Sequence, residues 1–161
     1  MSEQNNTQLI DYIKENLTGD TQRNVLNFVR HLASHEMTVK VDDDGGGGRV
    51  FFKGETVCDV WLRGGSEYPG PWTIWMYWAE TKSVPNDKRL MEITWAHVHN
   101  CENCVGGNNA WCRSDKKKTI LGRDFDNVCQ AAIAFTDPNA EAVECVKKLM
   151  EMRKCAIDSG E

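Results

Sequence analysis

A polar, cysteine-rich segment from His97 to Cys129 constrains the fold of this chain more than any other stretch. It is rich in glycine and asparagine and buries little apolar surface, so hydrophobic packing alone cannot order it. The segment contains four of the seven cysteines of the chain: Cys101, Cys104, Cys112 and Cys129. Four thiolates hold Zn²⁺ in a tetrahedral site and thereby contribute folding free energy. We therefore predict that these four cysteines bind one structural zinc ion.

Other roles for the same segment stay open at this point. In a catalytic zinc site a water molecule takes one position, and His97 or His99 would then replace a cysteine. Glu92 or Glu102 would act as the base in such a site. The CxxC pair also suits redox chemistry, although such pairs usually open a helix that follows a strand. An iron–sulfur cluster takes four cysteines too, but the ferredoxin spacings differ from the spacing found here.

Length and composition indicate a single globular domain over residues 1–161, with residues 1–6 disordered. The chain has 161 residues, of which 40% are hydrophobic and 27% charged, enough for one ordinary core. It contains no apolar run of about 18 residues and no signal-peptide pattern, so we expect a cytoplasmic protein without a membrane partner. The net charge of −5 argues against nucleic acid as a partner, because nucleic-acid binding needs a basic surface.

A cytoplasmic location bears on the cysteines outside the segment, because that compartment keeps thiols reduced. Metal ligation or buried thiols are then favoured over disulfides. The three remaining cysteines fall in strand or helix patterns, and we interpret them as small buried apolar residues: Cys58, Cys145 and Cys155.

Hydrophobic periodicity predicts an α+β fold in which an antiparallel sheet of about four to six strands packs with N-terminal, central and C-terminal helices. Helices are expected over residues 7–17, from the cap Asp20 onward, over residues 85–98, and from the cap Asp137 to about residue 155. Strands are expected over residues 37–41, 49–53, 56–62, 72–78, 118–121 and 130–135, although a short helix also suits the last range. The cysteine-rich loop would be attached to this framework.

Four consecutive glycines, Gly45 to Gly48, follow three aspartates. No lysine follows them as in a phosphate-binding loop, and the aspartates would repel phosphate. We therefore predict a mobile hairpin tip at this position.

The strand over residues 72–78 is unusual because it carries large apolar side chains on both faces. One face has Trp72, Ile74, Met76 and Trp78, and the other has Thr73, Trp75 and Tyr77. Since an antiparallel sheet with one solvated face would not show this pattern, either helices cover both faces or one face forms an aromatic-lined pocket.

We predict that Trp75 and Tyr77, together with Trp61 from the neighbouring strand, bind a small planar or cationic ligand in such a pocket. Trp61 joins this group only if the strand register sets it beside Trp75. If Trp75 lines the pocket, its truncation should cost little stability.

Basic residues gather near the end of the cysteine-rich segment: Arg113, Lys116, Lys117, Lys118 and Arg123. They can compensate the charge of thiolates, or the loop over residues 113–123 can dock an acidic protein partner. No Ser/His/Asp or Cys/His arrangement can be ordered from the sequence, so we assign no catalytic residue.

The block LGRDFDNVCQAAIAFTDPNAEAVECVKKLMEMRK, with CENC before it and PWTIW upstream, resembles a family of small uncharacterised cysteine-containing bacterial proteins. The resemblance covers most of the chain from about Thr56 onward. A more distant similarity is to the small-molecule-binding domains of GyrI-like regulators, which implies an antiparallel sheet with helices and an aromatic pocket. Neither resemblance implies a known activity.

The function favoured by these observations is a zinc-stabilised cytosolic binding or regulatory module without turnover, whose partner is a small molecule. A metal-dependent enzyme that uses the Cys/His segment is one alternative. A protein-interaction module that uses the basic loop is another.

Overall fold

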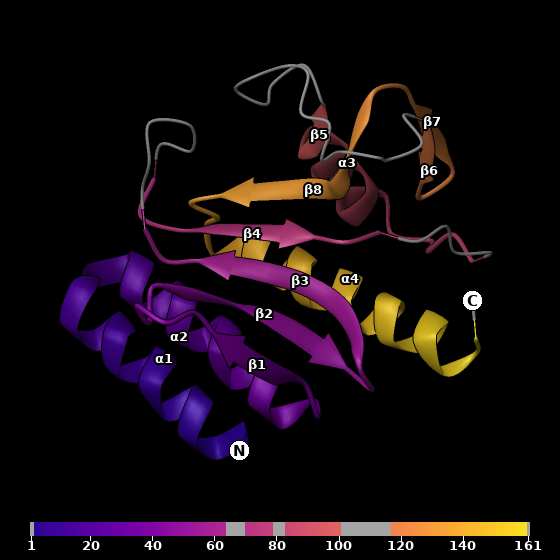
Figure 1. Cartoon of the computed structure of the whole chain (residues 1–161). Helices are drawn as coiled ribbons and strands as arrows, with labels where there is room; N and C mark the ends of the chain where they lie inside the picture. Colours follow the sequence, from indigo (N-terminus) through magenta and orange to yellow (C-terminus); the bar gives the residue numbers. More distant parts are fainter. Residues whose placement is uncertain (1, 64–69, 79–82, 101–116, 161) are drawn as a thin grey trace.

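The computed structural model describes residues 2–63, 70–78, 83–100 and 117–160, and within them one antiparallel sheet of six strands (Figure 1). The order of its strands is β1-β2-β3-β4-β8-β5. Their bounds are Thr38–Val41 (β1), Gly47–Phe52 (β2), Glu55–Trp61 (β3), Thr73–Met76 (β4), Val98–Asn100 (β5) and Val128–Thr136 (β8). Two further strands, Lys118–Ile120 (β6) and Arg123–Phe125 (β7), pair as a separate hairpin.

The helices are α1 (Ser2–Asn16), α2 (Gly19–Ser34), α3 (Lys88–Ala96) and α4 (Ala140–Asp158). This arrangement confirms the predicted α+β class, including the N-terminal, central and C-terminal helices. None of the described helices combines the length and the apolar composition that a membrane span requires.

One face of the sheet packs on α2 and α4, and the main core lies between this face and the two helices. Figure 1 shows α4 running behind the strands. The apolar stripe of α2, which includes Phe28 and Leu32, belongs to the same buried cluster as Val146 and Leu149 of α4. The opposite side of the sheet, which carries the exposed side chains of Lys40 and Arg49, is called the open face below.

The central strand β4 fixes this division because its side chains alternate as the sequence predicts. Towards the helices point Trp72, Ile74, Met76 and Trp78, all of which belong to the core cluster. Thr73, Trp75 and Tyr77 lie on the open face. Trp75 is outside the main core cluster, yet only 6% of its surface is exposed.

Several element boundaries differ from the prediction. Helix α1 begins at Ser2 and so includes residues 2–6, for which the sequence predicted disorder. Helix α2 is capped at Thr18 rather than Asp20. The cap of α4 is Asn139, whose side chain accepts a hydrogen bond from the N–H of Ala142, and not Asp137. Asp137 instead donates its N–H to the carbonyl of Trp72 at 2.8 Å, so it extends the pairing of β8 with β4.

Short strands account for the other differences. Three-residue strands such as β5 and β7 are too short to show a periodic pattern in the sequence, so neither one is predicted from it. Residues 130–135 fall within β8, so they form a strand and not the alternative short helix.

The glycine run lies partly in the predicted hairpin tip, because residues 42–46 connect the antiparallel strands β1 and β2. The prediction is wrong for the last two glycines. Gly47 and Gly48 belong to β2 and pair with Trp61 and Val60 of β3. A Cβ atom on Gly47 would lie 2.5 Å from the carbonyl oxygen of Val60, and one on Gly48 would lie 2.7 Å from that of Lys40. Glycine is therefore required here because neighbouring backbones approach too closely for any side chain.

The cysteines outside the predicted zinc site follow the prediction in two cases of three. Cys58 and Cys145 are buried, as expected for small apolar residues. Cys155 is exposed, which corrects that part of the prediction. It lies near the C-terminal end of α4, on the side of the helix that faces solvent.

We predict that Gly47→Ala lowers the free energy of unfolding by about 1–3 kcal/mol, because its new methyl group meets backbone atoms that cannot move aside. Urea denaturation measures the change. The matched control is Gly46→Ala, whose Cβ meets the side chain of Tyr12 at 3.2 Å, a group that can shift. Equal losses in the two variants would contradict the close approach of the strands.

Candidate functional site

A continuous row of side chains crosses the open face of the sheet. Residues paired across antiparallel strands point to the same side, so the strand register identifies this row. Lys40 pairs with Arg49, Arg49 with Asp59, Asp59 with Trp75, and Trp75 with Ala134. The row therefore runs from β1 to β8, with charged groups at one end and an aromatic ring near the other.

Arg49, Asp59 and Tyr77 form a hydrogen-bonded network in the middle of the open face. The Arg49 guanidinium donates from Nε to Oδ1 of Asp59 at 2.8 Å and from Nη2 to Oδ2 at 3.2 Å. The Tyr77 hydroxyl donates to Oδ2 of the same carboxylate at 2.8 Å. The carboxylate of Asp59 thus accepts three hydrogen bonds from two side chains, Arg49 on β2 and Tyr77 just after β4.

The electrostatics of this network follow from its partial burial. Burial, reinforced by the hydrogen bond to Asp59, raises the pKa of Tyr77 to about 12. The hydrogen bond to Asp59 raises the pKa of Arg49. Tyr77 is therefore a neutral donor and Arg49 a cation at neutral pH, so the network can position a ligand but supplies no free base.

Three aromatic rings lie next to the network. Trp61 faces Thr73 across the β3–β4 pair, so Trp75 is its diagonal neighbour, and the two indole centroids are 6.3 Å apart. His99 contacts the other side of Trp75, edge-on at 4.8 Å, and burial lowers the pKa of His99. The register required by the sequence prediction is thus confirmed for Trp61 and Trp75.

The roles within the predicted aromatic group differ from what the sequence suggested. Trp61 is 41% exposed, whereas Trp75 is 6% exposed and lies tilted against Trp61. Truncation of Trp75 would therefore cost stability, which corrects the expectation that it would not. Of the three predicted ligand-binding residues, Trp61 offers the largest accessible ring surface.

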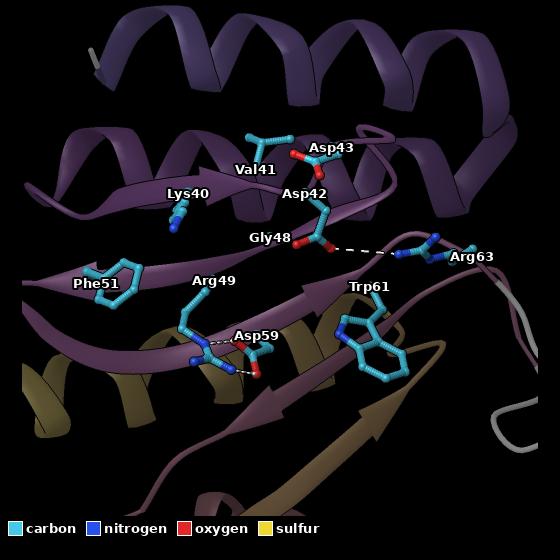
Figure 2. Close-up of a pocket in the computed structure, with 10 residues that line it drawn as sticks. All are labelled: Lys40, Val41, Asp42, Asp43, Gly48, Arg49, Phe51, Asp59, Trp61 and Arg63. Carbon is cyan, nitrogen blue, oxygen red and sulfur yellow. Dashed lines mark hydrogen bonds and ion pairs between the residues drawn. The ribbon is translucent and has the colours of Figure 1, made fainter.

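A groove of about 710 Å³ lies on the open face beside Trp61 (Figure 2). Its charged lining residues are Lys40, Arg49, Arg63, Asp42, Asp43 and Asp59. Figure 2 shows Trp61 and the Arg49–Asp59 pair on the same side of the sheet, with Arg63 reaching Asp42 at 3.7 Å. Arg63 also pairs with Asp44.

Sequence reasoning missed the charged residues of the groove. Asp59 stands two positions before Trp61, so strand alternation alone would have placed both on one face. Lys40 and Arg49 come from other strands, and only the register aligns them with Asp59.

The predicted zinc ligands Cys101, Cys104 and Cys112 lie outside the described residues. Cys129 is the second residue of β8 and is half-buried. Its thiol interacts with Tyr77 through its charge, which is the weakest of the causes that raise the pKa of the phenol.

His97, proposed as a substitute metal ligand, has a packing role among the described residues. Its Nδ1 lies 2.8 Å from the carbonyl of Ile93 and its ring stacks on Phe135 with centroids 4.4 Å apart. The basic loop is described only from residue 117 onward. There Arg123 lies over the rings of Trp95 and Phe125, and Lys117 lies 3.6 Å from Asp126, so both charges have local partners.

We predict that Asp59→Asn lowers the pKa of Tyr77 from about 12 while leaving it above 10.0, because burial still disfavours the phenolate. An ultraviolet titration of phenolate absorbance measures this, with Tyr77→Phe identifying the residue among three tyrosines. In the wild type the raised pKa also contributes stability below pH 10.0 that is lost as the pH rises through about 12. An unchanged titration in Asp59→Asn would contradict the network.

No protein-family model, curated protein or solved structure matches this chain. The resemblances to cysteine-containing bacterial proteins and to GyrI-like domains therefore stay predictions. Function has to be inferred from the residues that the structure describes.

Proposed function

We propose that this chain is a cytosolic binding or regulatory module that holds a small planar molecule against Trp61 in the open-face groove. The observation that carries the proposal is the large exposed surface of Trp61 beside a groove of about 710 Å³. Tryptophan exposed in a concave site is typical of ligand recognition, because indole offers a large rigid surface.

Trp75 supports this role by fixing the position of Trp61. The buried ring of Trp75 lies between Trp61 and His99, which restricts how far the Trp61 indole can move. A ring that is ordered before binding loses little conformational entropy when a ligand stacks on it. The Arg49–Asp59 pair next to it then offers polar groups to the edge of the ligand.

The charges of the groove favour a planar ligand with small net charge. The three basic and three acidic side chains of the lining balance one another. Arg49 pairs with Asp59 and Arg63 with Asp42, which leaves Lys40 and Asp43 at the β1 end of the groove for a polar substituent. A strongly cationic ligand, the other predicted class, would gain little from this balanced lining.

We extend the proposal to zinc at the four cysteines predicted from the sequence. Its support from the described residues is that Cys129 is a reduced, half-buried thiol, as a metal ligand at this position must be. A zinc ion bound there would anchor the cysteine-rich segment beside the open face and so stabilise the surroundings of the ligand site.

We predict that a planar heterocycle quenches tryptophan fluorescence of the wild-type protein and binds about tenfold more weakly to Trp61→Ala, the factor expected for the loss of one aromatic contact. Caffeine serves as the neutral probe and proflavine as the cationic probe. Native mass spectrometry of untagged protein would show whether a planar compound co-purifies with it.

The matched control is Trp95→Phe, which alters a half-buried tryptophan whose Nε1 donates to the carbonyl of Ile120 and which does not line the groove. This variant should bind both probes like the wild type. Equal affinity of Trp61→Ala and wild type would refute the groove as the ligand site. Tighter binding of proflavine than of caffeine would refute the preference for a ligand with small net charge.

We predict that Cys129→Ser loses the zinc ion held by the cysteines and that Cys155→Ser, which changes an exposed cysteine on α4, retains it. Elemental analysis, combined with a count of thiols protected from alkylation, measures both variants under reducing conditions. The zinc proposal would be refuted by wild-type protein in which no thiol gains protection when about one equivalent of zinc is added.

A further inference from the structure

Two histidines and a glutamate converge in the helical layer, on the side of the sheet away from the groove. His31 and His35 lie one turn apart at the C-terminal end of α2, and Glu151 lies on α4. The Oε1 atom of Glu151 is 3.4 Å from Nε2 of His31 and 3.9 Å from Nε2 of His35. All three atoms lie within 4.8 Å of one another.

The orientation of His35 makes its Nε2 an electron-pair donor. Nδ1 of His35 is 2.8 Å from the carbonyl oxygen of His31 and 2.9 Å from the hydroxyl of Ser34. The carbonyl can only accept and the hydroxyl can accept too, so the tautomer with the hydrogen on Nδ1 satisfies both contacts. In the neutral ring Nε2 then has a free lone pair that faces Glu151. A histidine whose other nitrogen donates to a backbone carbonyl is the arrangement usually found around bound metals.

The other two atoms are buried at the meeting point. Nε2 of His31 and Oε1 of Glu151 are both inaccessible to solvent, and within the described part of the chain neither has a hydrogen-bond partner. Three electron-rich atoms thus face one another, and a cation between them would relieve the cost of burying them.

The spacing and chemistry of the three atoms select the kind of cation. In a tetrahedral zinc site with bonds of about 2.0–2.1 Å, ligand atoms are about 3.4 Å apart. The two distances to Glu151, 3.4 and 3.9 Å, are close to that value. The two imidazoles stack with centroids 3.9 Å apart and their ligand atoms lie within 4.8 Å of each other, so metal binding requires their rings to turn towards a common point. Two imidazoles with one carboxylate favour Zn²⁺, Co²⁺, Ni²⁺ or Cu²⁺ over Mg²⁺ and Ca²⁺, which prefer oxygen ligands alone.

The surrounding charges are compatible with a bound cation. Lys154 lies 3.5 Å from Oε2 of Glu151, so the second carboxylate oxygen is held away and Oε1 remains for the metal. Lys147 donates to Glu144 at 2.6 Å and to Asn27 at 3.0 Å, so its charge is balanced by a carboxylate of its own.

We propose that His31, His35 and Glu151 bind one divalent transition-metal ion of the zinc class. The side chains of His35 and Glu151 are 38% and 41% exposed, so the fourth coordination position opens to solvent and takes a water molecule or an external ligand. The ion joins the last turn of α2 to α4. This site is separate from the predicted cysteine site and has no sulfur ligand.

Cobalt(II) chloride is the probe for this site, because the visible and near-ultraviolet spectra of Co²⁺ distinguish nitrogen and oxygen ligands from thiolates. We expect the wild-type protein to bind one Co²⁺ without thiolate-to-metal charge-transfer bands, in addition to any ion held by cysteines. His35→Ala and Glu151→Gln should each lower the affinity for that ion at least tenfold. Both changes are made at partly exposed side chains, and circular dichroism verifies that the variants are folded.

The matched control is Glu141→Gln, which removes an acidic group of α4 that pairs with Arg89 at 2.8 Å and is not among the charges that act on His31. This variant should keep the nitrogen- and oxygen-liganded ion within about twofold of the wild-type affinity, since it loses no ligand. A wild-type protein in which every bound Co²⁺ shows thiolate bands would overturn the proposal. The same holds if His35→Ala and Glu151→Gln bind the ion as tightly as the wild type.

Discussion

The sheet must present apolar side chains to α2 and α4, and this requirement determines what its other face can carry. Strand alternation sends Trp72, Ile74 and Met76 into the core, so Thr73 and Trp75 are left on the open face. Where the described helices lie on one side of a sheet, such residues either form a second buried layer or line a binding surface. Here Trp75 takes the first role and Trp61 the second.

The polar part of the open face depends on the same register. Arg49 and Asp59 pair across β2 and β3, and Tyr77 adds a second donor to the carboxylate. Arg49 is half exposed, so its ion pair contributes little to stability by itself. The ion pair instead orients the side chains, because the Asp59 carboxylate, the Arg49 guanidinium and the Tyr77 phenol hold one another in place beside the groove. All three hydrogen bonds to Asp59 are charge-assisted, and the two-pronged contact with Arg49 adds geometric specificity.

Between β1 and β3, the backbone itself sets the position of the groove. Gly47 and Gly48 allow β2 to approach its neighbours more closely than any residue with a Cβ atom would. Trp61 pairs with Gly47, so no side chain from β2 covers the indole on that side. A glycine run that looks flexible in the sequence is thus what leaves the tryptophan accessible.

The sequence by itself determined the elements whose patterns are local. The apolar stripes of α2 and α4, the hairpin of β2 and β3, and the two-faced alternation around Trp75 could all be predicted, because each follows from periods of 3.6 or 2 within one segment. The ends of helices were harder to predict from the sequence. Asp137 is a residue type favoured as a helix cap, but its backbone N–H donates to the carbonyl of Trp72, far away in the sequence.

Only the tertiary structure decided which groups meet. The alignment of Lys40, Arg49 and Asp59 depends on strand register, and the convergence of His31 and His35 with Glu151 depends on how α2 packs on α4. Two histidines one helical turn apart, in the sequence HLASH, are a visible signal of metal binding. Their third partner, however, lies more than a hundred positions later. Such contacts are set by the packing of the whole core, and no local pattern in the sequence specifies them.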